Sequence, residues 1–398
     1  FTTFQSSKPN ASVLRDNSPA NNNIRSFSAD FTHPGKMVRW QAGLKTTLTR
    51  TDNDVLWQQQ AGDSWLTDTG KTNHFIYKEN IYAAYTSAAI TLKKFDLNLG
   101  LRVEHTRTTG HSLTLAQLNE RQYTQLFPTL SAAYNSSEKQ QWGLAYRKSI
   151  LRPHFDILNP FIIYQSKYAY SQGNPYLQPS LDHHFELSYS YNNEWLASLG
   201  YDRYVQPIAA SVHNLGDSGA IVATSENLSS GDLIGLDLTW THRFLNGHWT
   251  TSNNAGLYYL RFSSDKDHSI DKQLFSALLS SDNQFMITKT LRAEVNATWY
   301  SPQINGAYHY QSMFTLGAGL STTFSKGNAN LALNISDIFN SARMRYAIIS
   351  GGVTANNTDH DESRFVRLTL TWRLGNKNVK TGRTRTTGID EVKNRMSN

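Results

Sequence analysis

The sequence contains no cysteine and no long apolar run. Without cysteine the chain can form neither a disulfide framework nor a thiolate metal site. A membrane-spanning helix needs about 20 predominantly apolar residues. Residues 295–325 contain no Asp, Glu, Lys or Arg, but Asn296, Pro302, Gly306 and many Ser and Thr residues interrupt them. The sequence therefore predicts no spanning helix.

Acidic residues are fewer than basic ones. The chain has 31 Asp and Glu against 38 Lys and Arg, which gives a net charge of +7 and a pI of about 9.3. Such an excess can indicate nucleic-acid binding, but the basic residues are spread along the chain. The one dense basic run is 377–395, where six Lys or Arg accompany Asp390 and Glu391. We therefore expect no nucleic-acid partner.

The clearest pattern is an alternation of apolar and polar residues from Ser363 to Leu374. Every second residue there is apolar, namely Val366, Leu368, Leu370, Trp372 and Leu374. Successive side chains of a β-strand point to opposite faces. The stretch therefore predicts a strand with one apolar face and one polar, charged face. The same alternation recurs along the chain, and no second kind of element is predicted to cover the apolar faces.

The alternation predicts about 16 strands, counting a short one at Phe1–Phe4. Their connections alternate between turns of a few residues, as at 33–36, 93–94, 192–194, 245–248 and 326–328, and long segments, as at 52–76, 110–123 and 152–181. Outer-membrane barrels pair short turns at one end with long loops at the other. The 20 Tyr and 9 Trp residues fit interfacial aromatic girdles. The sequence therefore predicts an all-β fold, a transmembrane antiparallel β-barrel.

Charged residues on the polar strand faces are expected to line the barrel lumen. They are Arg39, Arg102, Glu104, Arg147, Glu186, Asp202, Asp237, Arg243, Arg292, Glu294, Arg367 and Arg373. Such residues pair with one another in a hydrated interior, contact a plug, or line a substrate pathway, and the sequence does not separate these roles. Aromatic residues in the long loops are candidates for ligand binding, with packing of the loops on themselves as the alternative. They are Trp57, Trp65, Tyr164, Tyr168, Tyr170 and Tyr176.

Residue types that carry catalysis or bind metals lack the spacing that those roles need. His183 and His184 are adjacent, so a strand points them to opposite faces, which disfavours shared metal ligation. Residues 359–362 are acidic but lack the glycine and spacing of a calcium loop. Ser, His and Asp occur in no motif with a mechanical role. We therefore predict no enzyme, no metal site and no cofactor.

Short motifs between residues 124 and 191 point to a family. In order they are Leu126–Leu130 (LFPTL), Tyr146–Pro153 (YRKSILRP), Leu158–Phe161 (LNPF), Gly173–Pro179 (GNPYLQP) and Phe185–Tyr189 (FELSY). The series resembles the barrel of TonB-dependent receptors, especially the outer-membrane β-barrel family common in Bacteroidota. Residues 77–85 and 336–340 are similar to early-strand and late-strand motifs of that family. The tail, 382–395, is similar to tails in the same subgroup.

The resemblance implies a 22-stranded barrel with a plugged lumen, in which the plug and the energy-coupling segment precede the barrel. The sequence begins at Phe1 without an initiator Met. We therefore expect about six strands and the plug to lie upstream. On this interpretation residues 1–374 are the C-terminal portion of the barrel, and 375–398 are a basic periplasmic tail. A disordered, solvated tail is the expectation, with contacts to phospholipid headgroups as the alternative.

The function implied by the resemblance is that of a multi-pass receptor and transporter in the bacterial outer membrane. It would bind a nutrient at the extracellular loops and import it in a TonB-dependent manner. The implied partners are outer-membrane lipid, the plug domain, TonB and a surface lipoprotein. The alternative is a non-transporting structural barrel subunit of an outer-membrane protein complex, followed by a passive pore and an enzyme at the rim.

Overall fold

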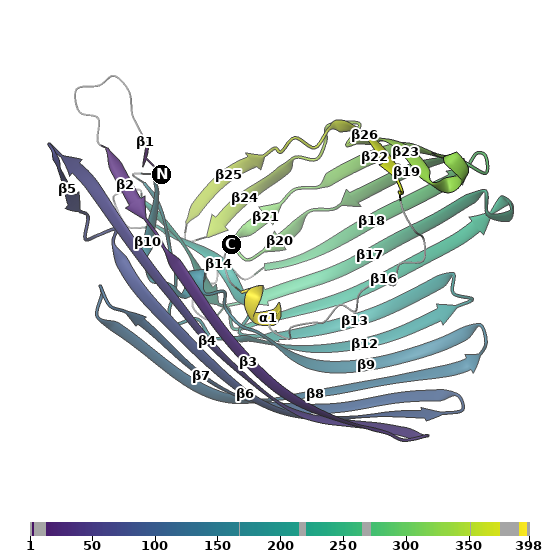
Figure 1. Cartoon of the computed structure of the whole chain (residues 1–398), viewed down its shortest axis with the longest axis horizontal. Helices are drawn as coiled ribbons and strands as arrows, with labels where there is room; N and C mark the ends of the chain where they lie inside the picture. Colours follow the sequence, from purple (N-terminus) through teal and green to yellow (C-terminus); the bar gives the residue numbers. More distant parts are fainter. Residues whose placement is uncertain are drawn as a thin grey trace.

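The structure is a computed structural model that describes residues 2–3, 13–166, 168–214, 220–264, 272–350, 352–374 and 390–395. Eighteen of its strands form one sheet, and every pairing in that sheet is antiparallel. The sheet curves into a deep concave wall, with the chain passing up and down from one neighbour to the next (Figure 1).

Three strands of this sheet are short and pair beyond the end of the wall: β1 (Thr2–Thr3), β2 (Leu14–Asn17) and β5 (Ser64–Thr67). The other fifteen form the wall: β3 (Ala20–Pro34), β4 (Val38–Ala61), β6 (Asn73–Leu92), β7 (Phe95–Ser112), β8 (Gln117–Ser137), β9 (Gln140–Leu151), β12 (Ser180–Tyr191), β13 (Trp195–Val205), β16 (Ser230–Phe244), β17 (Trp249–Ser263), β18 (Lys272–Met286), β19 (Leu291–Tyr300), β22 (Met313–Phe324), β23 (Ala329–Ser336) and β26 (Phe365–Trp372). Their number is close to the predicted 16.

The apolar residues of the alternating pattern lie on the convex face of the wall. In β26, Val366, Leu368 and Leu370 are 65%, 68% and 60% exposed. Side chains of this kind are stable on the outside of a barrel because lipid, and not water, surrounds them. The predicted transmembrane antiparallel β-barrel fold is thus confirmed. β3 pairs with β4 and β26 pairs with β23, and among the described residues no register joins β3 to β26.

Two segments expected to be loops are largely strand. β4 continues to Ala61 and β6 begins at Asn73, within the predicted loop 52–76. β7 continues to Ser112 and β8 begins at Gln117, within the predicted loop 110–123. The prediction was wrong there because it relied on apolar alternation. Backbone pairing continues past the apolar band, where both faces of a strand can be polar.

Two small sheets lie at the end of the wall that carries the long connections. One contains β10 (Ile162–Ser166), β11 (Ala169–Gln172), β15 (Ile221–Asn227) and β14 (Ile208–Asn214). The other contains β20 (Gln303–Asn305), β21 (Tyr308–Tyr310), β24 (Met344–Ser350) and β25 (Val353–Asp359). The two sheets meet where the backbone N of Ala307 donates to the carbonyl of Ala210 at 3.3 Å.

Helical structure in the described residues is confined to single turns. These are η1 (Asp156–Leu158), η3 (Leu245–Gly247), η5 (Ser325–Gly327) and α1 (Asp390–Lys393). Among the described residues, no helix is long and apolar enough to cross a membrane. η3 joins β16 to β17 and η5 joins β22 to β23, both at short turns of the wall. α1 lies within the concave side (Figure 1), and η1 packs its Leu158 in a cluster with Phe75 and Tyr77 of β6.

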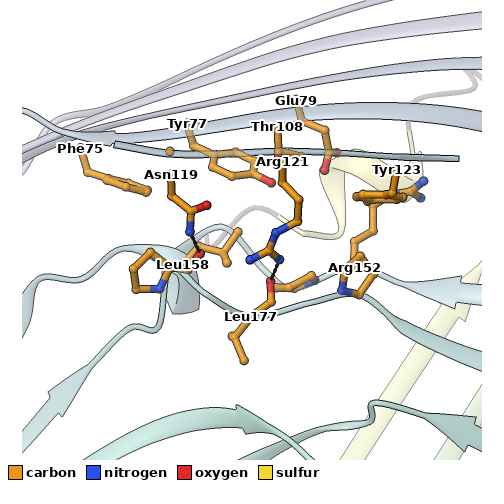
Figure 2. Close-up of a pocket in the computed structure, with 14 residues that line it drawn as sticks. Phe75, Tyr77, Glu79, Thr108, Asn119, Arg121, Tyr123, Arg152, Leu158 and Leu177 are labelled. Atoms are coloured by element: carbon orange, nitrogen blue, oxygen red, sulfur yellow. Dashed lines mark hydrogen bonds between the residues drawn. The ribbon is translucent and has the colours of Figure 1, made fainter. Parts of the chain in front are cut away.

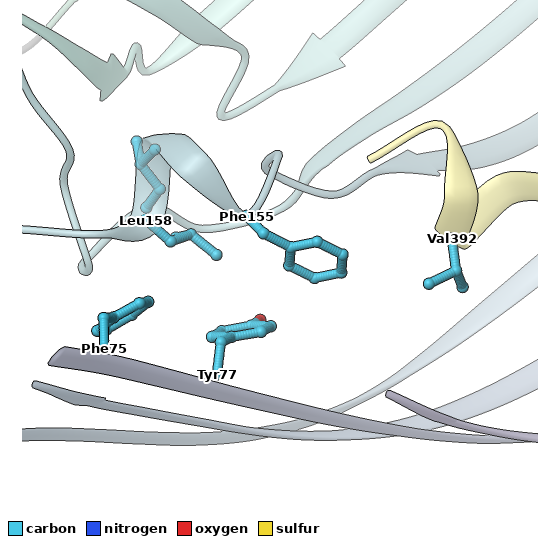
Figure 3. Close-up of a cluster of buried hydrophobic side chains, with 6 residues drawn as sticks. Phe75, Tyr77, Phe155, Leu158 and Val392 are labelled. Carbon is cyan, nitrogen blue, oxygen red and sulfur yellow. The ribbon is translucent and has the colours of Figure 1, made fainter. Parts of the chain in front are cut away.

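The largest cluster of buried apolar side chains lies on the concave face. It combines Phe75 and Tyr77 of β6 with Phe155, Leu158, Leu177 and Val392. Figure 3 shows Phe155 and Leu158 facing the two β6 aromatics, with Val392 approaching from α1. A long connection and part of the C-terminal tail thus pack on the inside of the wall. The tail was expected to be solvated, and for residues 390–395 that expectation was wrong, because Val392 and Arg395 are only 4% and 6% exposed.

Candidate functional site

A long connection, residues 152–179, joins β9 to β12 and folds onto the concave face of the wall. Its single turn η1 brings Phe155 and Leu158 against β6, where the rings of Phe155 and Tyr77 are 5.3 Å apart. Leu177, near the end of the connection, is 2% exposed in the same cluster. Burial of these apolar side chains favours the folded-in position of the connection over one extended into solvent.

Polar side chains of β8 hold the second half of this connection. Arg121 donates to the carbonyl oxygens of Leu177 and, at 3.1 Å, of Tyr176. Asn119 donates to the carbonyl oxygen of Pro175 at 2.6 Å. Figure 2 shows both side chains reaching from β8 to the connection. These bonds satisfy loop carbonyls that no strand partner satisfies, which is what a loop packed inside a protein requires.

The first half of the connection is held through Asn159. Its side-chain oxygen accepts from Asn73 Nδ2 at 2.8 Å and from the backbone N of Phe161 at 3.2 Å. Gly173 passes so close that a Cβ there would lie 2.1 Å from the Asn159 carbonyl oxygen, so only glycine fits. Both residues belong to the motifs Leu158–Phe161 and Gly173–Pro179, which therefore build this folded-in connection.

A buried arginine opens the connection and is paired with a carboxylate of β7. Arg152 is 3% exposed, and its Nη2 lies 2.5 Å from Glu104 Oε2. Arg102 donates from Nε to the other oxygen, Oε1, at 2.6 Å. Arg152 Nε also donates to the hydroxyl of Tyr123 at 3.3 Å. A buried charge is costly unless it is paired and hydrogen-bonded, and here the Glu104 carboxylate receives an arginine on each oxygen.

A second buried carboxylate pairs with the C-terminal tail. Glu79 of β6 is 1% exposed, and Arg395 contacts both of its oxygens, Nη1 to Oε2 at 2.6 Å and Nη2 to Oε1 at 3.1 Å. Arg395 Nε donates to the Pro153 carbonyl at 3.2 Å, and its guanidinium lies 4.6 Å from the centre of the Phe155 ring. A two-pronged arginine–carboxylate contact over an aromatic ring is among the strongest polar arrangements available to a protein.

Two cavities adjoin this region. A cavity of about 30 Å³ lies beneath the connection, beside Tyr77, Glu79 and Arg152 (Figure 2), and it is too small for anything but water. A cavity of about 570 Å³ opens at the long-connection end. Its walls come from β4, the connection 152–179, β14, β15 and the residue Tyr308. A space of that volume suits a small-molecule ligand.

The sequence matches a family model described as the outer membrane protein beta-barrel family over residues 1–372. The chain belongs to this family. It is therefore a bacterial outer-membrane β-barrel protein, and the concave side of its wall is the barrel lumen. No curated protein matches the sequence.

Solved structures of outer-membrane receptors resemble the barrel. The copper transporter OprC superimposes with a TM-score of 0.68 at 14% identity, over 91% of this chain and 60% of OprC. The ferric yersiniabactin uptake receptor FyuA from Yersinia pestis gives a TM-score of 0.61 at 14% identity, over 91% of this chain and 55% of the receptor. The ferric citrate transporter FecA gives 0.60 at 12% identity, over 93% of this chain and 57% of FecA. The chain thus spans little more than half the length of each, and at these identities the likeness establishes the fold.

The aromatic residues proposed from the sequence as ligand contacts are distributed over the long-connection end of the barrel. Trp57 lines the 570 Å³ cavity. Trp65 instead lies under the Arg15 guanidinium, 4.2 Å from its ring centre. Tyr168 and Tyr176 are exposed, and Tyr170 is half-buried in β11. The side chain of Tyr164 lies outside the described residues. Their role in binding stays a prediction.

The charged residues predicted to line the lumen share one face of the wall. Directly paired residues of neighbouring strands point to the same face, so the strand registers show which residues share the face of the buried Glu79. These residues include Arg39, Arg102, Glu104, Arg147, Glu186, Asp202, Asp237, Arg243, Arg292, Glu294 and Arg367. Arg373 follows the end of β26. Some of these charges pair along the wall: His184 Nδ1 lies 2.5 Å from Asp202 Oδ1, and Tyr258 donates to Asp237 at 2.5 Å. Whether they form a substrate pathway stays a prediction.

Sequence reasoning missed Glu79, Arg152, Phe155 and Arg395 as members of the site. One signal was present for Glu79, because a carboxylate stands between Tyr77 and Ile81 on the same strand face. The sequence carried no comparable signal for Arg395, whose partner is 316 residues away.

Proposed function

We propose that this barrel is part of an outer-membrane receptor that binds a nutrient at its outer loops and imports it in a TonB-dependent manner. The 570 Å³ cavity carries this proposal. It lies at the end of the barrel with the long connections and draws apolar and aromatic walls from several of them, including Trp57, Phe161, Ile163 and Tyr308. Aromatic walls with a few polar groups are typical of small-molecule sites.

The names of the similar structures support the proposal without fixing the ligand. Those proteins handle ferric yersiniabactin, copper and ferric citrate. Each is much longer than this chain, and the edges of β3 and β26 are not joined to each other within the described residues. Unpaired strand edges are strongly unfavourable in lipid. We therefore include in the proposal further wall strands, a plug, contact with TonB and a surface lipoprotein partner.

Uptake by cells that carry the full-length protein tests the proposal. The probes are ferric siderophores, ferric citrate and copper, given to cells with and without TonB. Trp57→Ala, which removes a cavity wall, should weaken uptake of the recognised probe about tenfold, as loss of an aromatic contact does elsewhere. Leu66→Ala, at an exposed residue outside the cavity lining, is the control and should leave uptake unchanged. Uptake that ignores TonB, or equal losses in the two variants, would contradict the proposal.

A second candidate is a non-transporting structural barrel subunit of an outer-membrane protein complex. One observation favours it: the connection 152–179 and residues 390–395 occupy part of the lumen with the chain's own side chains. Planar-bilayer conductance of the full-length protein separates the two candidates. A structural subunit should stay closed whether or not a ligand is present, and it should purify with its complex in a fixed ratio.

A further inference from the structure

The C-terminal segment Asp390–Arg395 packs on the concave side of the wall through two of its side chains. Its single helical turn, closed by the bond from Arg395 N to the Val392 carbonyl at 3.2 Å, points Val392 and Arg395 to the same side. Val392 enters the apolar cluster and Arg395 enters the polar contacts beside it. Between them, Lys393 and Asn394 face solvent.

The surroundings of Arg395, which we call the arginine niche, consist of Glu79, the Pro153 carbonyl and the Phe155 ring. Every nitrogen of the Arg395 guanidinium has a partner in the niche. The two Glu79 carboxylate oxygens accept hydrogen bonds from Nη1 and Nη2, the Pro153 carbonyl accepts one from Nε, and the Phe155 ring covers one face. Lysine has one charged nitrogen and cannot reproduce this set of contacts. A backbone hydrogen bond adds to these contacts: Phe155 N donates to the Arg395 carbonyl at 3.2 Å.

The cation in the niche comes from a distant part of the chain. With Arg395 in place Glu79 is 1% exposed, and a carboxylate covered in this way needs a cation to offset its lost hydration. Arg152 lines the same 30 Å³ cavity as Glu79, and its own guanidinium is bonded to Glu104. We therefore expect Arg152 to shield the Glu79 charge when Arg395 leaves. Such an arrangement allows the segment to dock reversibly.

The last wall strand ends at the end of the wall far from the niche. β26 ends at Trp372, and the backbone N of the following Arg373 donates at 2.8 Å to the carbonyl of Asn328 in a short turn. Glu79 lies thirteen residues along β6 from Leu92, which is at the short-turn end, and this separation is roughly 44 Å along the strand. Sixteen Cα–Cα steps separate Leu374 from Asp390 and can span at most about 55 Å. The chain is therefore long enough to cover that separation along the strand.

We propose that Asp390–Arg395 is an internal ligand of the barrel and that the arginine niche is its receptor. The niche recognises an arginine three positions after an aliphatic residue. Docking fixes Pro153 and Phe155, the start of the folded-in connection, and Phe155 also lines the 570 Å³ cavity. Occupancy of the niche and the shape of that cavity are therefore coupled, and such a coupling acts in both directions. The inference does not depend on what the barrel imports.

Residues 1–398 contain no cysteine, so single cysteines can be introduced there and labelled selectively once any cysteine elsewhere in the full-length protein is replaced by serine. In the full-length protein in outer membranes, Val392→Cys should react with a water-soluble maleimide at least about tenfold more slowly than Asn394→Cys, because Val392 is buried and Asn394 is exposed in the same turn. Adding Arg395→Ala should raise the Val392→Cys rate to that of Asn394→Cys. Adding Lys393→Ala, which removes an exposed positive charge from the same segment, should leave the protection intact.

Competition gives a second measurement that leaves the barrel unaltered. A synthetic peptide with the sequence of residues 390–395 should speed labelling of Val392→Cys, and the same peptide ending in alanine should not. Heat-modifiable migration on gels confirms that each variant remains a folded barrel. Equal rates for Val392→Cys and Asn394→Cys, protection that survives Arg395→Ala, or a failure of the arginine peptide to compete would overturn the proposal. None of these readouts requires uptake, so a failure here is distinct from a failure of the import proposal.

Discussion

At the scale of single residues, buried carboxylates each bind several donors from distant segments. Glu104 is bonded to Arg102 and Arg152, and Glu79 is bonded to Arg395. A third carboxylate, Asp337, plays a comparable part between β23 and β26. Its left-handed backbone, with φ of +42°, turns the chain at the end of β23. In each case a carboxylate holds together segments that no strand ladder joins.

The Asp337 carboxylate holds its connection through several donors. Ser363 donates its hydroxyl at 2.6 Å, and the backbone N atoms of Ala342 and Ser341 donate at 3.0 and 2.9 Å. Burial alone would raise the pKa of Asp337, but the hydrogen bonds from Ser363, Ala342 and Ser341 outweigh it and lower the pKa to about 2. The charged form is thus the one that stabilises the connection.

A pH dependence follows from this lowered pKa. The ordinary pKa of an aspartate is about 3.9, so Asp337 stabilises its connection fully above about pH 4 and loses that contribution as pH falls through about 2. Carbon-13 NMR of the aspartate carboxyls should show one signal with a titration midpoint near pH 2. That signal is assigned to Asp337 if it is missing from the spectrum of Asp337→Asn. A midpoint near the ordinary value would show that the hydrogen bonds do not favour the charged form.

At the scale of elements, the two faces of β26 meet different surroundings. Leu368 and Thr369 are neighbours in the strand, so their side chains point to lipid and to lumen respectively. Leu368→Arg should lower the free energy of unfolding in a bilayer, and so the stability, by about 2–4 kcal/mol if the residue is near the midplane. Thr369→Arg should reduce it far less. Urea titration of both variants in lipid vesicles measures the difference, and equal losses would contradict the assignment of faces.

The same strand shows what sequence reasoning recovers. The alternation in β26 is local, so the strand, its two faces and its place in a barrel wall were predictable from the residues alone. The extensions of β4 and β7 were not, because polar residues on both faces of a strand leave no alternation to read. The folded-in connection was marked by the motifs at Leu158–Phe161 and Gly173–Pro179, but its direction, inward, depends on contacts with β6 and β8.

The candidate site was less predictable than the wall because distant residues build it. Glu79 and Arg395 are 316 residues apart, and Asn73 and Asn159 are 86 apart. Of the five predicted ligand-binding aromatic residues whose side chains the structure describes, Trp57 is the one that lines the large cavity. Aromatic residues in the long connections could be read from the sequence. Their convergence on one cavity depends on the two small sheets, which no alternation in the sequence predicted.

At the scale of the whole molecule, the wall divides its connections into two sets. The short turns, among them Asn192–Glu194 between β12 and β13, lie at one end, and the long connections with both small sheets lie at the other (Figure 1). The large cavity is lined by residues of these long connections and small sheets. In outer-membrane barrels the short turns face the periplasm and the long loops face the outside. We therefore expect the end of the barrel that carries the cavity to face the outside.

Labelling of intact cells tests this orientation. The proposed receptor function depends on it, because the cavity must be open to the outside. Tyr168, at the long-connection end, is 55% exposed, and Asn193 is exposed in a short turn. In the cysteine-free chain, a membrane-impermeant maleimide should label Tyr168→Cys on intact cells, and it should label Asn193→Cys only after the outer membrane has been permeabilised. Labelling of Asn193→Cys on intact cells, with Tyr168→Cys protected until permeabilisation, would contradict the account.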